Sequence, residues 1–203
     1  MDKTLTGPDR AIPSRPPDTR PGEASDGDLI AMVADGEVAA FRALYMRYQP
    51  RLTRFLFNIV PKAQIIEEVL DDTLMVVWER AGSFKGESKL STWIFAIAYR
   101  KAMKALRKFD EPVEDRNAEL RRSPEAGPEE EFARHRVHEL LREAMSQLSA
   151  EHRAVVDLSY FHNLGYREIA EIMHCPVDTV KTRMFYARRH LRRHLDGNLP
   201  DWI

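Results

Sequence analysis

Apolar residues recur at intervals of three and four positions over two long stretches of the chain, residues 28–108 and 132–195. This spacing places them on one face of a helix and is typical of amphipathic α-helices. Neither stretch contains a long alternation of apolar and polar residues, which would mark a half-buried strand. The pattern therefore predicts an all-α protein with two small helical domains.

The first helical stretch is predicted to contain four helices. We expect Asp28 to cap a short helix over residues 29–33, and a second run to begin at Val38 and end near Pro50. The same spacing continues over residues 52–59. A third helix is expected over residues 63–80, with one apolar stripe. Four acidic side chains lie off that stripe: Glu67, Glu68, Asp71 and Asp72.

A last helix of this domain follows a loop with two glycines and is capped by Ser91 or Thr92. It carries a core face and a second row formed by Phe95, Tyr99 and Met103. Five basic residues and no acid lie between Tyr99 and Lys108. A basic-aromatic face suits a single nucleic-acid strand, since cations meet phosphates and rings stack on bases. The alternative is a solvated cationic helix whose aromatic residues pack against a neighbouring element.

The second stretch predicts a helix-turn-helix. Ser149 is expected to cap a helix that holds Tyr160 among its inner residues, and the turn is expected at residues 174–176. From Pro176 to Leu195 there are six Lys or Arg residues against one acid, a local charge of +5. In a DNA-binding helix-turn-helix the second helix enters the major groove and its cations contact phosphates. A protein-binding helix-turn-helix is the alternative.

Three polar segments flank or join the two stretches. Residues 1–27 contain five prolines and three glycines and are expected to form a disordered arm. Residues 109–131 hold nine acidic and three basic residues, a net −6, and predict a flexible acidic linker. Residues 196–203 form a C-terminal tail. The expected domains are therefore 28–108 and 132–195.

Composition excludes several classes of protein. No window is apolar enough to cross a membrane and the N-terminus lacks the apolar core of a signal peptide, so we expect a soluble cytoplasmic protein without membrane insertion. A single cysteine, Cys175, excludes an internal disulfide and a multi-cysteine metal site. We find no phosphate loop, nucleophile elbow or apolar carboxylate pair, and so expect no enzyme, cofactor, metal or small-molecule substrate. The formal charge of −1 argues against DNA binding only if its uneven distribution is ignored.

Several segments occur in an order that resembles bacterial sigma factors of the extracytoplasmic-function (ECF) type, in the sigma-70 family. Residues 83–93, Ser-Phe-Lys-Gly-Glu-Ser-Lys-Leu-Ser-Thr-Trp, are similar to the promoter-melting segment of that family. Residues 67–73 are similar to its polymerase-binding helix. Residues 178–183 and 187–189 are similar to its promoter-reading helix. The resemblance covers residues 28–195 and implies a region 2 bundle and a region 4 helix-turn-helix.

The resemblance also implies roles for individual residues. The four acidic residues Glu67, Glu68, Asp71 and Asp72 would bind core RNA polymerase. The minus-ten promoter DNA would contact Phe84, Lys85, Gly86, Glu87, Ser88, Arg100 and Lys101. The minus-thirty-five DNA would contact Thr179, Lys181, Thr182, Arg183, Phe185, Tyr186, Arg188 and Arg189.

As a member of this family the protein would direct transcription initiation in a stress or environmental response. Its partners would be core RNA polymerase, promoter DNA and an anti-sigma factor that occludes both domains. Two other classes remain open at this point. A helix-turn-helix regulator would bind DNA without being a polymerase subunit, and an interaction scaffold would do neither.

Overall fold

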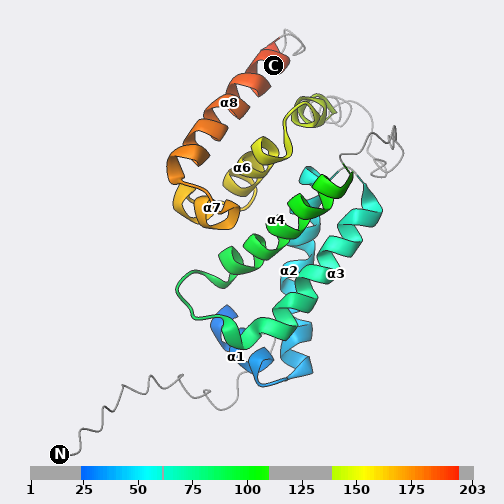
Figure 1. Cartoon of the computed structure of the whole chain (residues 1–203), viewed down its shortest axis with the longest axis vertical. Helices are drawn as coiled ribbons and strands as arrows, with labels where there is room; N and C mark the ends of the chain where they lie inside the picture. The colour runs from blue at the N-terminus through cyan, green and yellow to red at the C-terminus, as the bar shows by residue number, and fades with distance from the viewer. Residues whose placement is uncertain (1–23, 61, 110–138, 197–203) are drawn as a thin grey trace, which may run out of the picture.

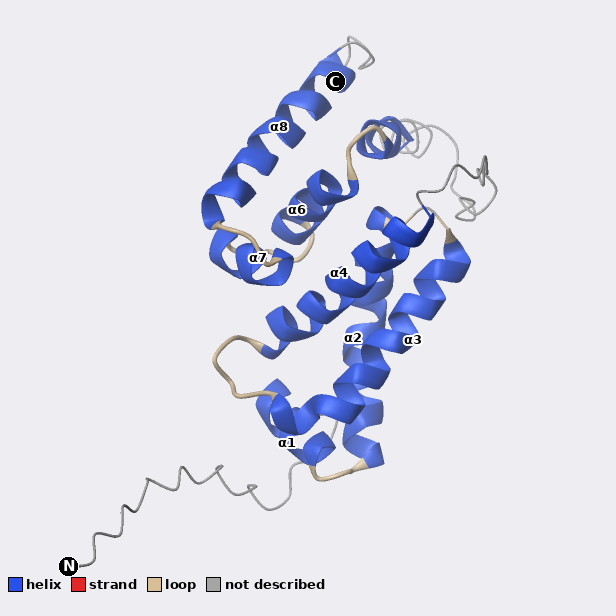
Figure 2. Ribbon diagram, viewed as in Figure 1, coloured by secondary structure: helices blue, strands red, loops and turns tan. Residues whose placement is uncertain are grey.

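The chain folds into helices joined by short turns (Figures 1 and 2), and the computed structural model describes residues 24–60, 62–109 and 139–196. The N-terminal domain contains α1 (Asp26–Ala34), α2 (Val38–Ile59), α3 (Ala63–Arg80) and α4 (Leu90–Phe109). A 3-10 turn at Ala81–Ser83 follows α3. The C-terminal domain contains a helical segment at residues 139–146, α6 (Ala150–Tyr160), α7 (Tyr166–Met173) and α8 (Val177–Asp196). No strand occurs in these ranges, so the all-α prediction is confirmed there. The expected arm, linker and tail lie almost wholly outside them.

The start of α1 differs from the prediction because two residues share the capping. Ser25 is the N-cap, and its hydroxyl accepts a hydrogen bond from the Asp28 amide at 3.2 Å. The Asp28 carboxylate in turn accepts from the Ser25 amide at 3.2 Å. Asp28 is therefore the third residue of a capping box rather than the cap. The box moves the start of the helix to Asp26.

Pro50 does not end the second helix, which runs unbroken through it to Ile59. Proline removes one backbone hydrogen bond and crowds the carbonyl four residues earlier, here that of Met46. Both Met46 and Pro50 are exposed, so water can satisfy that carbonyl. Buried Tyr48 and Leu52 hold the helix on either side, and the Tyr48 hydroxyl donates to Asp26. Packing on the core side therefore outweighs the lost hydrogen bond.

The core of the N-terminal domain lies between α2, α3 and α4. The bounds of α3 agree with the predicted 63–80, and its apolar stripe is buried. Thr73 in that stripe is also buried and donates its hydroxyl to the Val69 carbonyl at 2.6 Å. Helix α4 begins at Leu90, one residue before the earlier of the two expected caps. Val38, which was expected on the apolar face, is exposed at the first turn of α2.

The C-terminal domain has the predicted helix-turn-helix. Ser149 caps α6 as expected, and His174 takes the left-handed conformation, with φ 50°, that turns the chain between α7 and α8. Val180 and Met184 anchor α8 in the core. Tyr160 was expected inside, but it is 56% exposed because it sits in the last turn of α6.

The two domains pack directly against each other, with α7 on α4 and α6 on α2 (Figure 1). Asn58 donates to Asp157, and Arg153 Nη2 donates to the Ile59 carbonyl at 3.0 Å. His162 is buried beneath Asp157 and lies 4.6 Å, centroid to centroid, from the Phe95 ring. The structure therefore holds the domains in one compact arrangement, which the sequence pattern did not predict.

Candidate nucleic-acid interface

The four acidic residues of α3 form a separate exposed patch. Glu67, Glu68, Asp71 and Asp72 are all exposed, since the apolar stripe turns the opposite face of α3 into the core. One of them is paired across the helices, with the Lys101 Nζ of α4 at 2.8 Å from Asp72 Oδ2. The patch can attract a basic partner. The Asp72–Lys101 ion pair joins the acidic patch of α3 to the basic side chains of α4.

The loop between α3 and α4 presents a mixed aromatic and charged surface. Phe84 packs against Trp93 with ring centroids 5.5 Å apart, and this contact fixes the start of the loop. Gly86 has φ +70°, a conformation that residues with a Cβ rarely adopt, so glycine suits this position. Lys85, Gly86 and Glu87 are exposed and Ser88 is half-buried. The structure thus places five of the seven residues expected at the minus-ten DNA on one accessible loop, and the other two, Arg100 and Lys101, on α4.

The aromatic row of α4 does not form an open nucleic-acid face. Phe95 and Tyr99 are buried between the domains, and Met103 is half-buried. Burial raises the pKa of Tyr99 to about 12, with the Glu151 carboxylate adding to the rise and Arg183 opposing it. The alternative reading of this row, in which the rings pack against a neighbouring element, is therefore confirmed. Arg100 remains exposed, and its Nε donates to the Ala96 carbonyl at 3.2 Å.

Helix α8 presents two aromatic residues and several cations to solvent. Phe185 and Tyr186 are 61% and 52% exposed and meet edge to face at 5.4 Å. Four more residues of the expected minus-thirty-five set are exposed: Lys181, Thr182, Arg188 and Arg189. Thr179, from the same set, is half-buried. Helix α8 is the second helix of the helix-turn-helix, and exposed aromatic residues beside cations on such a helix are suited to the DNA major groove.

Arg183 is set apart from that exposed surface. It is half-buried, and its Nη1 donates to Cys175 Sγ at 3.7 Å. Its charge also acts on Tyr99 in α4 and on Glu151 in α6. In this arrangement Arg183 faces the domain boundary, so it does not share the open face of Phe185 and Tyr186.

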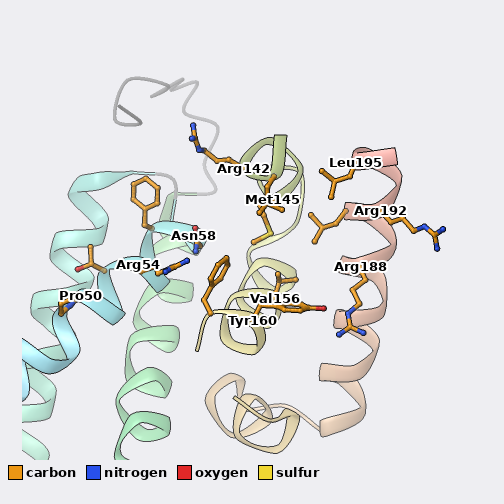
Figure 3. Close-up of a pocket in the computed structure, with 15 residues that line it drawn as sticks. Pro50, Arg54, Asn58, Arg142, Met145, Val156, Tyr160, Arg188, Arg192 and Leu195 are labelled. Atoms are coloured by element: carbon orange, nitrogen blue, oxygen red, sulfur yellow. The ribbon is translucent and has the colours of Figure 1, made fainter. Parts of the chain in front are cut away.

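A groove of about 1050 Å³ lies where α2 meets the C-terminal domain (Figure 3). Its floor is apolar and includes Phe57, Met145 and Val156, while Arg54 and Arg192 stand at its rim. Among the residues that the structure describes, no acidic side chain lines it. Sequence reasoning missed this site, because its lining comes from two segments more than eighty positions apart, 50–58 and 141–195. The structure leaves aromatic side chains of both segments exposed, at Phe57, Tyr160 and Phe161.

Two family models match the chain. The model described as Sigma-70 region 2 matches residues 44–110, and the model described as Sigma-70, region 4 matches residues 138–191. The chain belongs to the sigma-70 family. As a sigma factor it is not an enzyme, since the polymerase performs the chemistry. Region 2 thus corresponds to the N-terminal domain and region 4 to the C-terminal domain.

Curated relatives place this sigma factor among the ECF type. It is 28% identical over 189 residues to the RNA polymerase sigma-H factor of Pseudomonas aeruginosa, covering 88% of this chain and 98% of the relative. It is 28% identical over 176 residues to the ECF RNA polymerase sigma-E factor of Escherichia coli K12, covering 82% and 92%. It is 29% identical over 160 residues to the ECF sigma factor RpoE of Cereibacter sphaeroides, covering 77% and 87%.

Solved structures share the fold of this sigma factor. The structure of CnrH in complex with the cytosolic domain of CnrY matches with a TM-score of 0.62 and 22% identity, over 84% of this chain and 96% of that one. The sigma factor RpoE of Bartonella quintana, in complex with the anti-sigma factor NepR, matches with a TM-score of 0.60 and 25% identity, over 79% and 99%.

Across residues 24–60, 62–109 and 139–196, no group of three or more His, Cys, Asp or Glu side chains is arranged to hold a metal ion. Among the helices of those same ranges, none has the length and apolar character needed to span a bilayer.

Proposed function

We propose that this sigma factor docks on core RNA polymerase through the acidic face of α3 and reads promoter DNA with α8 and the loop at residues 84–88. The observation that supports this most strongly is the separation of charge. The acidic patch of α3 and the basic, aromatic surface of α8 lie on different elements, at opposite edges of the view in Figure 1. One chain can therefore hold a basic protein partner and DNA at the same time.

In vitro transcription tests this function. Core polymerase and the full chain are incubated with a pool of genomic fragments, and the RNA starts are sequenced. We expect starts that share two upstream sequence elements and that are absent with core alone. Glu68→Lys in the acidic patch should abolish the starts without reducing binding to DNA, whereas Glu79→Lys, an exposed acid outside the four, serves as the control.

A DNA-binding regulator predicts the opposite result. It would bind duplex DNA but would neither co-purify with core polymerase nor direct new starts. Transcription of promoters that respond to an environmental stress is the expected role, and the cytoplasm, where polymerase and DNA meet, is the expected location.

An anti-sigma factor is the third partner we propose, bound as an amphipathic helix in the groove between α2 and region 4. The groove offers an apolar floor and an arginine rim without acids, which fits a helix with one apolar face and acidic flanks. A relative of similar fold, RpoE of Bartonella quintana, was solved in complex with an anti-sigma factor.

Site-specific photo-crosslinking in native cells tests the groove. A photoreactive residue at Phe57 should capture a protein that, once purified, inhibits transcription by core plus this sigma factor. Met46 provides the matched control, because it is an exposed apolar residue of the same helix that does not line the groove. Equal capture from both positions, or capture of a protein without inhibitory activity, would remove the assignment.

A further inference from the structure

A second pocket, of about 350 Å³, lies between the start of α6 and the middle of α8. From the α6 side it is lined by Ser149 and His152. The α8 side contributes Tyr186, Arg189, His190 and Arg193. Within the described part of the chain, no carboxylate lines it. Two guanidinium groups around a small hollow make a cationic site, and two imidazoles lie beside them.

The donors in this pocket match a phosphate group. Guanidinium groups bind phosphate oxygens with paired N–H donors, and imidazole and hydroxyl groups add single hydrogen bonds. Ser149 is the N-cap of α6, and the Ser149 Oγ lies 2.8 Å from His152 Nδ1, which orients the imidazole. The first turn of the eleven-residue α6 adds the positive end of its helix dipole.

The pocket is continuous with the promoter-reading surface. Tyr186 and Arg189 line it and also belong to the residues expected at the minus-thirty-five DNA. Tyr186 is 52% exposed, so one side of its ring is open to DNA while the other edges the pocket. A DNA backbone that passes α8 on this side would bring a phosphodiester group to the pocket mouth.

We propose that this pocket binds one backbone phosphate of the minus-thirty-five DNA and that His152 couples this contact to proton uptake. The inference rests on the proposed function, because the ligand is promoter DNA. The chemistry is that of a phosphate anion. A free phosphate ion could supply the same chemistry, and the experiment below separates the two sources.

The coupling follows from the charges around His152. Burial lowers the pKa of His152, and the charges of Arg183 and His190 lower it further, while Glu151 opposes them. The remaining charged groups of the pocket, Arg189 and Arg193 on α8, are also positive. A phosphate in the pocket adds negative charge and favours the imidazolium form. DNA binding should therefore take up protons and strengthen as the pH falls from 8 to 6.

The test measures affinity and pH dependence with the full chain. Fluorescence anisotropy follows a labelled duplex that contains a minus-thirty-five element identified by the sequenced RNA starts. We expect about tenfold tighter binding at pH 6 than at pH 8, in line with uptake of up to one proton. His152→Gln should flatten this dependence, and His190→Gln, which removes a side chain that lines the pocket, should weaken binding. Arg193→Gln should weaken binding and reduce the salt slope by about 0.9.

Matched variants and probes separate the outcomes. Arg42→Gln removes the same charge from an exposed position on α2 and should change neither the affinity nor the pH dependence. Titration of the parent protein with inorganic phosphate, followed by the NMR signals of its histidine rings, reports free phosphate. Saturation at low millimolar phosphate without a change in DNA binding by the histidine variants would assign the pocket to a free anion and overturn the proposal.

The proposed function can stand when this inference fails. If His152→Gln keeps the parent pH dependence while core-dependent transcription persists, the pocket does not bind promoter phosphate. If transcription itself fails, the sigma assignment of the reading surface is wrong. A duplex with a single neutral methylphosphonate, moved along the backbone, should locate the contact as one position where Arg193→Gln has no further effect.

Discussion

Asn58, in the last turn of α2, donates a hydrogen bond from its side chain to the carboxylate of Asp157, ninety-nine residues later in α6. Asp157 is completely buried, and its other oxygen lies 3.1 Å from His162 Nε2. The rings of Phe55 and Phe95 close over His162 from region 2. A carboxylate of region 4 is thus shielded from water by side chains of region 2.

This contact holds a closed arrangement that we expect promoter binding to change. The nominal positions of the minus-ten and minus-thirty-five elements differ by about 25 base pairs, or about 85 Å of duplex at 3.4 Å per pair. In the closed arrangement α4 packs on α7, so the two DNA-reading elements lie far closer than that. We therefore expect regions 2 and 4 to separate when the protein binds polymerase and DNA.

Asn58→Ala should favour the separated form. The substitution removes the hydrogen-bond donor of a buried carboxylate, which costs about 1–3 kcal/mol as long as the interface stays shut. Opening lets water solvate Asp157 instead. Small-angle X-ray scattering of the free protein should show a larger radius of gyration than that of the parent.

The matched control for Asn58→Ala is Gln49→Ala. Gln49 lies on the same helix, but its amide donates at 3.2 Å to Thr53 within that helix. Its removal should leave the radius of gyration unchanged. An unchanged radius for both variants would show that the Asn58–Asp157 contact does not hold the domains together.

Lys101→Ala should separate polymerase binding from DNA-strand capture, because one ion pair connects a residue expected in each function. Lys101 of α4 is paired with Asp72 of α3 at 2.8 Å, so a cation expected at DNA neutralises an acid expected at polymerase. The pair is partly exposed and contributes only about 0–1 kcal/mol to folding stability. Removing the lysine should leave Asp72 free for core polymerase while weakening strand capture.

Two measurements check this separation. Affinity for core polymerase should stay equal or rise, while permanganate reactivity of the melted promoter should fall. Asp72→Asn is the reciprocal variant, with weaker core binding expected. A parallel fall of both quantities in Lys101→Ala would indicate a general structural defect, which thermal unfolding can identify.

The sequence predicts elements whose signals are local. The stripe of α3 is continuous and starts just after a proline, and its bounds of 63–80 agree with the structure. The helix-turn-helix depends on small and apolar residues at short spacing, and its core residues Ile169, Ala170 and Met173 are buried. The sequence alone therefore predicts which residues share one face of a helix.

Contacts between distant segments escaped this reasoning. Pro50 looked like a helix end because its cost is local, whereas the packing of Tyr48 and Leu52 that offsets it is tertiary. Phe95 and Tyr99 carried a spacing that fits either a DNA strand or a packed neighbour. Only the position of region 4 decides between the two.

The ion pair between Lys89 and Glu168 should give the closed form a pH dependence. Lys89 Nζ and Glu168 Oε1 lie 2.9 Å apart, and the pair joins the residue just before α4 to α7. The hydrogen bond from Lys89, helped by the Gly165 amide, lowers the pKa of Glu168 below its ordinary 4.5. Because the folded-state pKa is lowered, the stabilisation is full above pH 4.5 and disappears as the pH falls through the lowered value.

Thermal unfolding of Lys89→Ala from pH 3 to pH 7 checks this dependence. Lys89 is largely exposed, so the pair contributes about 1 kcal/mol at most, or a melting difference of about 2–4 °C at pH 7. The difference from the parent should vanish near pH 3. Lys85→Ala removes the same charge from the same loop and should give no such pH-dependent difference.

Phe84→Ala should impair promoter melting without affecting duplex binding. Phe84 packs on Trp93 and shapes the loop expected to capture an unpaired base, whereas duplex DNA is expected to contact α8. Capture has to offset the few kcal/mol lost when a base leaves the stack. Loss of one aromatic contact, about 1–2 kcal/mol, should lower the open-complex fraction roughly tenfold.

Permanganate footprinting measures the open-complex fraction, and anisotropy measures duplex affinity. The control is Val38→Ala, at an exposed position outside the loop. Parent-level permanganate reactivity in Phe84→Ala would move base capture away from this loop.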